Sequence, residues 1–533
     1  MNTANAPAAN TWRALAAACE RPVGSEGERL RTSMLGAAGF TLAAHGFSFF
    51  TFMPQHDALI ESYWQSTDWV ISLGRFLLPV YMRLRGYMAM PWTAGMLTML
   101  FFGLSVYFVT RSLRMDTRAE ILLTAGFFSA NFCVLAINSL FQFALDAYIC
   151  SLLFACMGVW LVSDRPGLRE ALLAAVCFFI SVGIYTAFIT AALCLFMVLA
   201  LQEAADRNGL PREFWKKLGV WALTLAAAAA AYFVASRLAL SAAGVTGADK
   251  NTSVFSMGAL SAGDIVHRLG VNYYFFTVMH FLGFSPVHHA DYLGVGAGVM
   301  SSLLAVLCIV SFCREHAGTL KKGIYVLFVL VAGLFPFVSR LVPLLTGNGN
   351  SYHTMFAQYL VQPVLLWLFF RRAKPSGGAP RRAAAVLAAV ALSLGLIGAN
   401  IRYSNEAYTL QQVIYDRTLY HTGRVIEDLQ EAGYDRGAGD KVVLSGTFEL
   451  NSDLDRQLGQ YIDAGFAGFN DTSVTYAATF RSAARLLGYT VSVGSADQSA
   501  DPEAVRALLE TMPAYPAEGY VREIDGFYLV RLS

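Results

Sequence analysis

The sequence carries little charge for its length. Asp, Glu, Lys and Arg together make up 14% of its 533 residues, whereas about 25% is usual in soluble domains. Hydrophobic residues reach 56%, and the mean hydropathy is +0.48, so a soluble globular fold is excluded. The formal net charge is only +2. Since the sequence also has no basic stripe interleaved with aromatic residues, no nucleic-acid partner is expected.

Metal-ligand spacing is missing as well. The eight cysteines lie in or beside apolar runs, none follows residue 313, and no pair has C-x-x-C spacing. They are expected to act as small hydrophobic residues in membrane helices. His288, His289 and Asp291 lack tight spacing on a helix, so neither a divalent metal nor another cofactor is expected. The first 32 residues lack the apolar stretch of a cleavable leader, so no signal peptide is expected.

Long apolar runs dominate what is present. A helix needs about 20 apolar residues to cross the hydrocarbon core of a bilayer. The sequence therefore predicts an all-α polytopic domain over residues 33–403 with about 11 transmembrane helices. The pair at 170–203 can also be read as one long kinked helix. The runs are 33–54, 91–110, 119–137, 147–163, 170–186, 187–203, 218–238, 294–312, 322–339, 354–370 and 382–400.

The distribution of Lys and Arg predicts the orientation. Basic residues concentrate in residues 1–32 and in every second connection between the runs, and such segments stay in the cytoplasm. Counting 170–203 as one span would put the later basic loops on the wrong side. We therefore expect a bacterial inner-membrane protein with a cytoplasmic N-terminus. Two long outer loops follow from this arrangement, at 55–90 and 240–292.

The chain changes character from about residue 404. Acids outnumber bases, and no stretch from there on could span a membrane. "KVVLSG" (441–446) and "YTVSVG" (489–494) are typical of buried strands. Asp501 and Pro502 mark a helix start, and Asp525-Gly526 between alternating strands predicts a hairpin. We expect an α/β domain over 404–533 on the periplasmic side.

The stretch "FFTFMPQHDALIESYW" (49–64) places an acid directly after the first apolar run. Asp57 has His56 beside it, and Glu61, four residues on, would share a helix face with it. The rest of the loop is rich in Trp and Tyr, as interfacial helices are. Asp57 alone could be a solvated loop residue, but an interfacial loop that begins with an acid is not a generic connection.

Three segments carry a resemblance to a known family. "TDWVISLGRFL" (67–77), "SVGIYTAF" (181–188) and the closing "MPAYPAEGYVREIDGFYLVRLS" resemble segments of the Gtr-type glucosyltransferases, O-antigen-modifying members of the GT-C superclass. The resemblance implies an inverting transfer of a sugar, usually glucose, from a polyprenyl-phosphate donor at the extracytoplasmic face. Its partners would be that donor, a lipid-linked glycan acceptor such as O-antigen, and membrane lipids. The family usually has an acidic pair where this chain has His56-Asp57.

The resemblance gives roles to the residues near the outer surface. A carboxylate at headgroup depth could accept the proton of the acceptor hydroxyl, which is typically worth about 10²–10⁴-fold in rate. Asp57 is the candidate for this base, with His56 or Glu61 assisting. Arg75 and Arg340 are candidates for binding the donor phosphate, although either could simply reach lipid headgroups.

Two further residues stand at the predicted outer edge of spans. Asp146 could bind the acceptor or act as a second acid, because a carboxylate at membrane depth usually has a purpose or a partner. It could equally be a helix-boundary residue. Tyr185 could contact a sugar through its ring or hydroxyl, or belong to the interfacial aromatic belt.

Two other functions share parts of this pattern. A glycolipid transporter or flippase is disfavoured because inverted repeats and midplane charges are not detectable. An O-antigen polymerase or ligase would use similar outer-face chemistry but relies more on arginine-rich loops. The acid at position 57 favours the transferase.

Overall fold

The computed structural model describes residues 6–54, 67–164, 166–247, 261–282, 292–346, 352–371, 380–446 and 473–533. The chain divides into two compact units. The first comprises Met1–Phe50, Ser66–Ile137 and Ala144–Ser404, and the second comprises Thr51–Gln65, Asn138–Phe143 and Asn405–Ser533.

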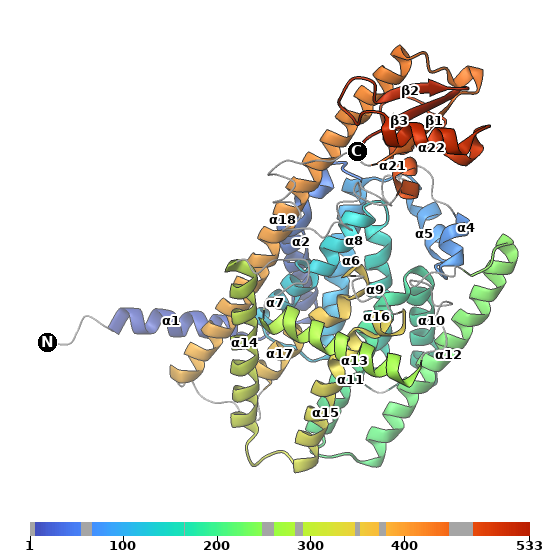
Figure 1. Cartoon of the computed structure of the whole chain (residues 1–533). Coiled ribbons are helices and arrows are strands. Elements are labelled where there is room, and N and C mark those ends of the chain that lie inside the picture. The colour runs from blue at the N-terminus through green and yellow to red at the C-terminus, as the bar shows by residue number, and fades with distance from the viewer. Residues whose placement is uncertain are drawn as a thin grey trace. The chain divides into compact units, whose positions relative to one another are not determined.

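Helices make up the first unit (Figure 1). Most are long, and short 3-10 or π segments join several of them. Helices α8 and α18 also supply residues to the second unit. The elements are α1 (Ala6–Cys19), α2 (Glu26–Phe50), α4 (Thr67–Ser72), α5 (Leu78–Arg85), α6 (Pro91–Ser112), α7 (Arg118–Ser129), α8 (Phe132–Leu140), α9 (Leu145–Leu161), α10 (Leu168–Ile184), η1 (Thr186–Phe188), α11 (Ile189–Asp206), α12 (Arg212–Ala243), α13 (Ala262–Thr277), η3 (Val278–Leu282), α14 (Tyr292–His316), α15 (Lys322–Ser339), α16 (Leu341–Thr346), η4 (Tyr352–Thr354), η5 (Phe356–Leu360), α17 (Val361–Phe370) and α18 (Pro380–Glu431).

Seven helices among the described residues are long and apolar enough to cross a membrane, so the chain is a multi-pass membrane protein. Every predicted run overlaps a helix, but α2, α9, α10 and the stretch Phe356–Phe370 are shorter or more polar than these seven. The count of about 11 spans therefore stays a prediction. Within the run at 170–203 the α-helix breaks at η1, between α10 and α11.

Local sequence signals set where the helices of the first unit begin. Pro91 is the first residue of α6, where its missing N–H is not needed. Thr117 and Glu120 form a capping box at the start of α7. The Thr117 side chain accepts a hydrogen bond from the Glu120 N–H, and the Glu120 side chain accepts one from the Thr117 N–H. Helix α6 packs against both α2 and α9, and α9 packs against α10. This arrangement places α9 and α10 side by side, so residues from both helices can meet.

The second unit contains a three-stranded sheet in the order β1-β3-β2. Strand β1 (Lys441–Ser445) pairs in parallel with β3 (Phe527–Arg531), and β2 (Val521–Ile524) pairs with β3 in antiparallel fashion. The predicted hairpin is confirmed, because Asp525 and Gly526 join β2 to β3 with φ values of 50° and 76°. This left-handed pair is what a two-residue hairpin turn requires.

Two other local predictions in this unit have different outcomes. The side chain of Asp501 accepts a hydrogen bond from the Ala504 N–H at 3.0 Å and caps α22 (Pro502–Thr511), as predicted. "YTVSVG" is not a strand, which corrects the prediction for 489–494. Only Val493 pairs with Val442 of β1, in an isolated bridge, and a 3-10 turn begins three residues later. Helix α21 (Ser473–Leu486) also belongs to this unit.

Candidate active site

The connection between α4 and α5 is anchored to helices α10 and α12. Gly74 turns the chain with a φ of 82°, a conformation that favours glycine. The Tyr232 hydroxyl of α12 donates to the Gly74 carbonyl at 3.1 Å, and the Leu77 N–H donates to the Gly183 carbonyl of α10 at 3.0 Å. These bonds hold Arg75, which lies between them in sequence, in a defined place.

Close approach of this connection to α10 depends on Gly183. A Cβ atom at this position would lie 2.7 Å from Cδ1 of Leu77 and 3.3 Å from Cζ of Phe76. Both distances are too short for an ordinary side-chain contact, so only glycine permits the packing seen here. The segments "SLGRFL" and "SVGIYTAF", separate in the sequence, are thereby brought together.

Arg75 lies against two stacked tyrosines. Its Nη1 donates to the Tyr148 hydroxyl at 2.9 Å, and its guanidinium carbon is 4.9 Å from the centre of the Tyr185 ring. The two rings stack with centroids 4.2 Å apart and planes inclined by 19°. Both tyrosines are buried, while Arg75 is only half-buried. The aromatic faces favour the cation and hold it in one orientation, and part of it stays accessible.

Asp146 forms a buried ion pair at the start of α9. Its side chain is 0% exposed, and its Oδ2 lies 3.1 Å from Nε of Arg85, whose side chain is 4% exposed. The Tyr81 hydroxyl donates to the same oxygen at 2.7 Å. Burial, and then the neighbouring carboxylate, raise the pKa of Tyr81 far above its ordinary value, so the hydroxyl keeps its proton. Oδ1 of Asp146 has no hydrogen-bond partner within the described ranges.

These side chains form one group, which we call the Arg75–Asp146 cluster. Its members come from the α4–α5 connection, from α5, from the first turn of α9 and from the end of α10. Asp146 and Tyr148 both belong to the first turn of α9, so the ion pair and the aromatic stack are anchored on the same turn. The cluster consists of Arg75, Tyr81, Arg85, Asp146, Tyr148 and Tyr185.

Arg340 lies in a second buried polar group, directly after α15, and is 1% exposed. Its Nε donates to Oδ1 of Asn272, and its Nη1 donates to Oε1 of Gln358, both at 2.9 Å. The segment that carries Gln358 also contacts the first cluster, because the Tyr185 hydroxyl donates to the His353 carbonyl at 3.0 Å. The segment Tyr352–Leu360 thus connects the two groups.

The structure brings Arg75, Asp146 and Tyr185 together and links Arg340 to them. His56, Asp57 and Glu61 lie outside the described residues, as do the histidines at 288 and 289. Among the residues that are described, no group of three metal-ligand side chains comes together.

Sequence reasoning missed Arg85 and Tyr148, and it saw Tyr81 only as an interfacial aromatic. One signal could have found Arg85. A carboxylate at the end of an apolar helix needs a cationic partner, and "MRLRGY" (82–87) in the first outer loop offers two arginines. Nothing in the sequence distinguishes Tyr148 from other tyrosines at the ends of spans.

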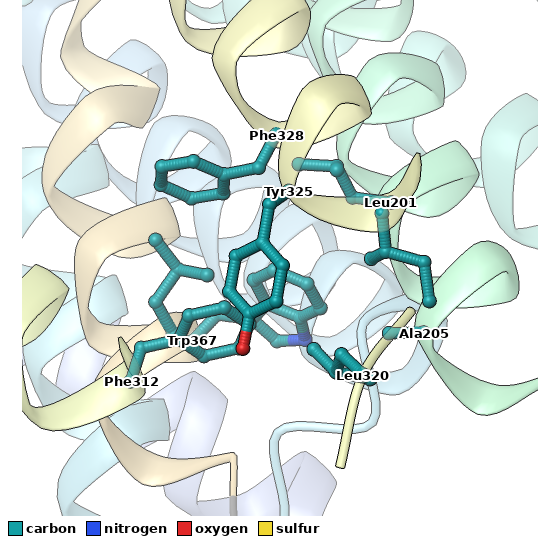
Figure 2. Close-up of a pocket in the computed structure, with 9 residues that line it drawn as sticks. Leu201, Ala205, Phe312, Leu320, Tyr325, Phe328 and Trp367 are labelled. Atoms are coloured by element: carbon teal, nitrogen blue, oxygen red, sulfur yellow. The ribbon is translucent and has the colours of Figure 1, made fainter. Parts of the chain in front are cut away.

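One small pocket can be set aside as a substrate site. It lies between α11, α14, α15 and α17 and is lined by apolar and aromatic side chains such as Leu201, Phe312 and Trp367 (Figure 2). Its volume is about 10 Å³, which is room for roughly one water molecule. It is too small for a sugar.

The helices and the cluster together define a multi-pass membrane protein with charged and aromatic side chains gathered at the ends of its helices. Residues 46–369 match the family described as Glucosyl transferase GtrII, and this is more than half of the chain, so the chain belongs to that family. It is accordingly a membrane glucosyltransferase, an enzyme with a sugar donor and an acceptor as substrates. No curated protein and no solved structure matches the chain.

Proposed function

We propose that this enzyme is an inverting transferase that moves glucose from polyprenyl-phosphate glucose to a surface glycan such as O-antigen. The observation that carries the proposal is the half-buried Arg75, backed by two tyrosines, inside the region that matches the glucosyltransferase family. A guanidinium presented in this way suits a phosphate ligand, since its fork of N–H donors matches phosphate oxygens.

The proposed reaction takes place at the extracytoplasmic face of a bacterial inner membrane. The distribution of Lys and Arg supports a cytoplasmic N-terminus and a periplasmic C-terminal domain. The lipid tail of the donor stays in the bilayer, so its sugar-phosphate bond lies at headgroup depth. A loop that begins at residue 55 and continues through the short helices α4 and α5 suits a reaction at this depth.

In the proposed step, the Asp57 carboxylate accepts the proton of the acceptor hydroxyl. The oxygen of that hydroxyl attacks the anomeric carbon from the side opposite the phosphate. The bond between the anomeric carbon and the phosphate oxygen breaks, and polyprenyl phosphate leaves with its electron pair. A single displacement of this kind inverts the anomeric configuration. His56 and Glu61 are proposed to hold or tune the base.

The described residues have proposed roles around that step. Arg75 neutralises the phosphate as its charge grows, and Tyr148 and Tyr185 keep the guanidinium in place. Arg340 is a second candidate for the phosphate, held ready by amide side chains. Asp146 is fully buried, so its proposed role is to position the site by holding Tyr81 and Arg85 through Oδ2.

Membership of a glucosyltransferase family favours this proposal over a glycolipid transporter or flippase. An O-antigen polymerase or ligase would share the outer face and the lipid-linked substrates. Transfer of a single glucose is the activity that the family description favours.

Replacing Arg75 tests the proposed donor site. Arg75→Ala should raise the KM for the lipid-linked donor by about 10–100-fold, because hydrogen bonds to charged groups are worth about 1.5–3 kcal/mol. The KM for the acceptor should change little. Arg83→Ala is the matched control, since Arg83 is an exposed arginine of the same loop. Equal weakening for donor and acceptor would instead assign Arg75 a structural role.

A further inference from the structure

A second and much larger pocket lies away from the Arg75–Asp146 cluster. Its volume is about 840 Å³. Arg169, which lines it, is in the first turn of α10, whereas Tyr185 follows the last residue of the same helix. The two positions are therefore about 24 Å apart along the helix axis. On the predicted orientation this pocket opens at the cytoplasmic surface.

Charged side chains from four helices, α6, α10, α11 and α12, and from the connections beside them converge on this pocket. Five of the lining residues are cationic and four are acidic, and the rest of the wall is apolar. The cations are Arg111, Arg114, Arg169, Arg207 and Lys217, the acids are Asp164, Glu170, Glu203 and Asp206, and the apolar residues are Trp160, Leu161 and Leu173.

The acids of the pocket are already engaged by groups of the chain itself. Glu203 pairs with Arg207 and, at 2.8 Å, with Lys217. Asp206 pairs with Arg114 at 2.9 Å and with Arg371, which lies outside the lining. Asp164 also pairs with Arg114, and Glu170 accepts a hydrogen bond from the Gly167 N–H. Arg111 in turn pairs with Glu26, outside the lining, at 2.6 Å. Five cations against four acids leave the lining with one excess positive charge, which favours an anionic ligand.

Arg114 is held in an unusual backbone conformation at the edge of this pocket. Its φ is 52°, in the left-handed region that residues other than glycine seldom adopt. Such a conformation persists only where the surroundings fix it, and here the ion pairs to Asp164 and Asp206 do so. The Arg114 side chain is 51% exposed, so its guanidinium lines the pocket and also meets solvent.

One cation at the mouth of the pocket stands apart. Arg169 is exposed and forms no ion pair with another described residue. Two turns of the same helix expose Leu172, Leu173 and Val176, as expected of a face turned toward lipid. Leu173 belongs both to this face and to the pocket wall. A charged pocket is thus continuous with an apolar surface.

We propose that this pocket binds the phosphate headgroup of an anionic phospholipid, whose acyl chains lie along the exposed face of α10. Arginine suits the phosphate diester, and basic pockets between membrane helices on the cytoplasmic side bind anionic headgroups. Arg169 is placed to contact the phosphate. Arg111, which pairs with Glu26 at 2.6 Å and whose guanidinium carbon lies 5.7 Å from the centre of the Trp160 ring, lines the same pocket. The site is separate from sugar transfer and does not depend on the proposed donor.

The test is a titration of the purified full chain in detergent with short-chain phosphatidylglycerol. The unfolding temperature of the protein is measured at each lipid concentration. The expected result is a saturable rise that phosphatidylcholine of the same chain length does not produce. Arg169→Gln should weaken the apparent affinity about fivefold, the value of one basic residue near an anionic surface. Arg169→Glu should weaken it further. Arg314→Glu is the matched control, since Arg314 is exposed in the last turn of α14 and outside this pocket.

Three results would overturn the proposal. Equal stabilisation by the two lipids would show that the charged side chains only hold the helix ends together. Equal affinity of the wild type and Arg169→Glu would place the lipid elsewhere. The same saturable rise with inorganic phosphate alone would identify a site for a soluble anion. The comparison of two lipids uses the wild type, so it stands even if a variant fails to fold.

Discussion

Asp57→Asn is expected to abolish glucose transfer while the protein remains in the membrane at its normal level. Asparagine has the same shape as aspartate, but it cannot accept the proton of the acceptor hydroxyl. General-base assistance is typically worth about 10²–10⁴-fold, so the rate should fall by at least that lower factor. The measurement is the initial rate of label transfer in membranes that contain matched amounts of each variant.

A neighbouring acid supplies the control for this experiment. Asp68 is an exposed residue in the first turn of α4, in the same predicted outer loop. Asp68→Asn should retain wild-type activity, which would separate a specific role of Asp57 from a general effect of charge in the loop. An active Asp57→Asn variant would remove Asp57 from the mechanism.

The second large effect concerns the ion pair between Arg85 and Asp146. Asp146→Ala would remove the carboxylate that pairs with the Arg85 guanidinium, whose side chain is only 4% exposed. Breaking a buried pair from one side destabilises a protein by about 3–5 kcal/mol. We expect a large fall in the unfolding temperature in detergent and a lower yield from membranes. The double variant Arg85→Met/Asp146→Ala removes both charges and should recover much of that loss.

Comparing the single and double variants also distinguishes a structural role of the ion pair from a role in substrate binding. The double variant should be stable but inactive if the cluster contacts substrate, whereas recovery of both stability and activity would limit the pair to a structural role. Additive effects of the two substitutions on the unfolding temperature would contradict a direct interaction between them. Tyr81→Phe is a milder companion, because it removes only the hydroxyl that donates to Asp146.

Local sequence signals predicted much of the fold. The apolar runs located the membrane helices because length and composition alone decide whether a helix can span. Asp501 and the Asp525-Gly526 turn were predictable for a similar reason, since caps and tight turns depend on a few adjacent residues. "YTVSVG" does not form a full strand, because its backbone bonds β1 at one position only, through the Ser492 carbonyl and the Gly494 N–H to Val442. Only Val493 of that segment meets the edge of β1.

The candidate site was predictable residue by residue but not as an assembly. Arg75, Asp146 and Tyr185 stood out because each is a polar or aromatic residue at the expected outer edge of a span. Their convergence depends on packing between segments 65 to 73 positions apart. It also depends on the absence of a side chain at Gly183. No local pattern carries that information, and so the pairing of Arg85 with Asp146 emerged only from the structure.

The central claim is that glucose comes from a lipid-linked phosphate and reaches the acceptor at the outer face. Right-side-out vesicles containing the acceptor should be supplied with radiolabelled polyprenyl-phosphate glucose, polyprenyl-phosphate galactose or a nucleotide-linked glucose. The account predicts label on the acceptor from polyprenyl-phosphate glucose and none from the nucleotide sugar. Transfer from the nucleotide sugar in membranes free of polyprenyl phosphate would contradict it.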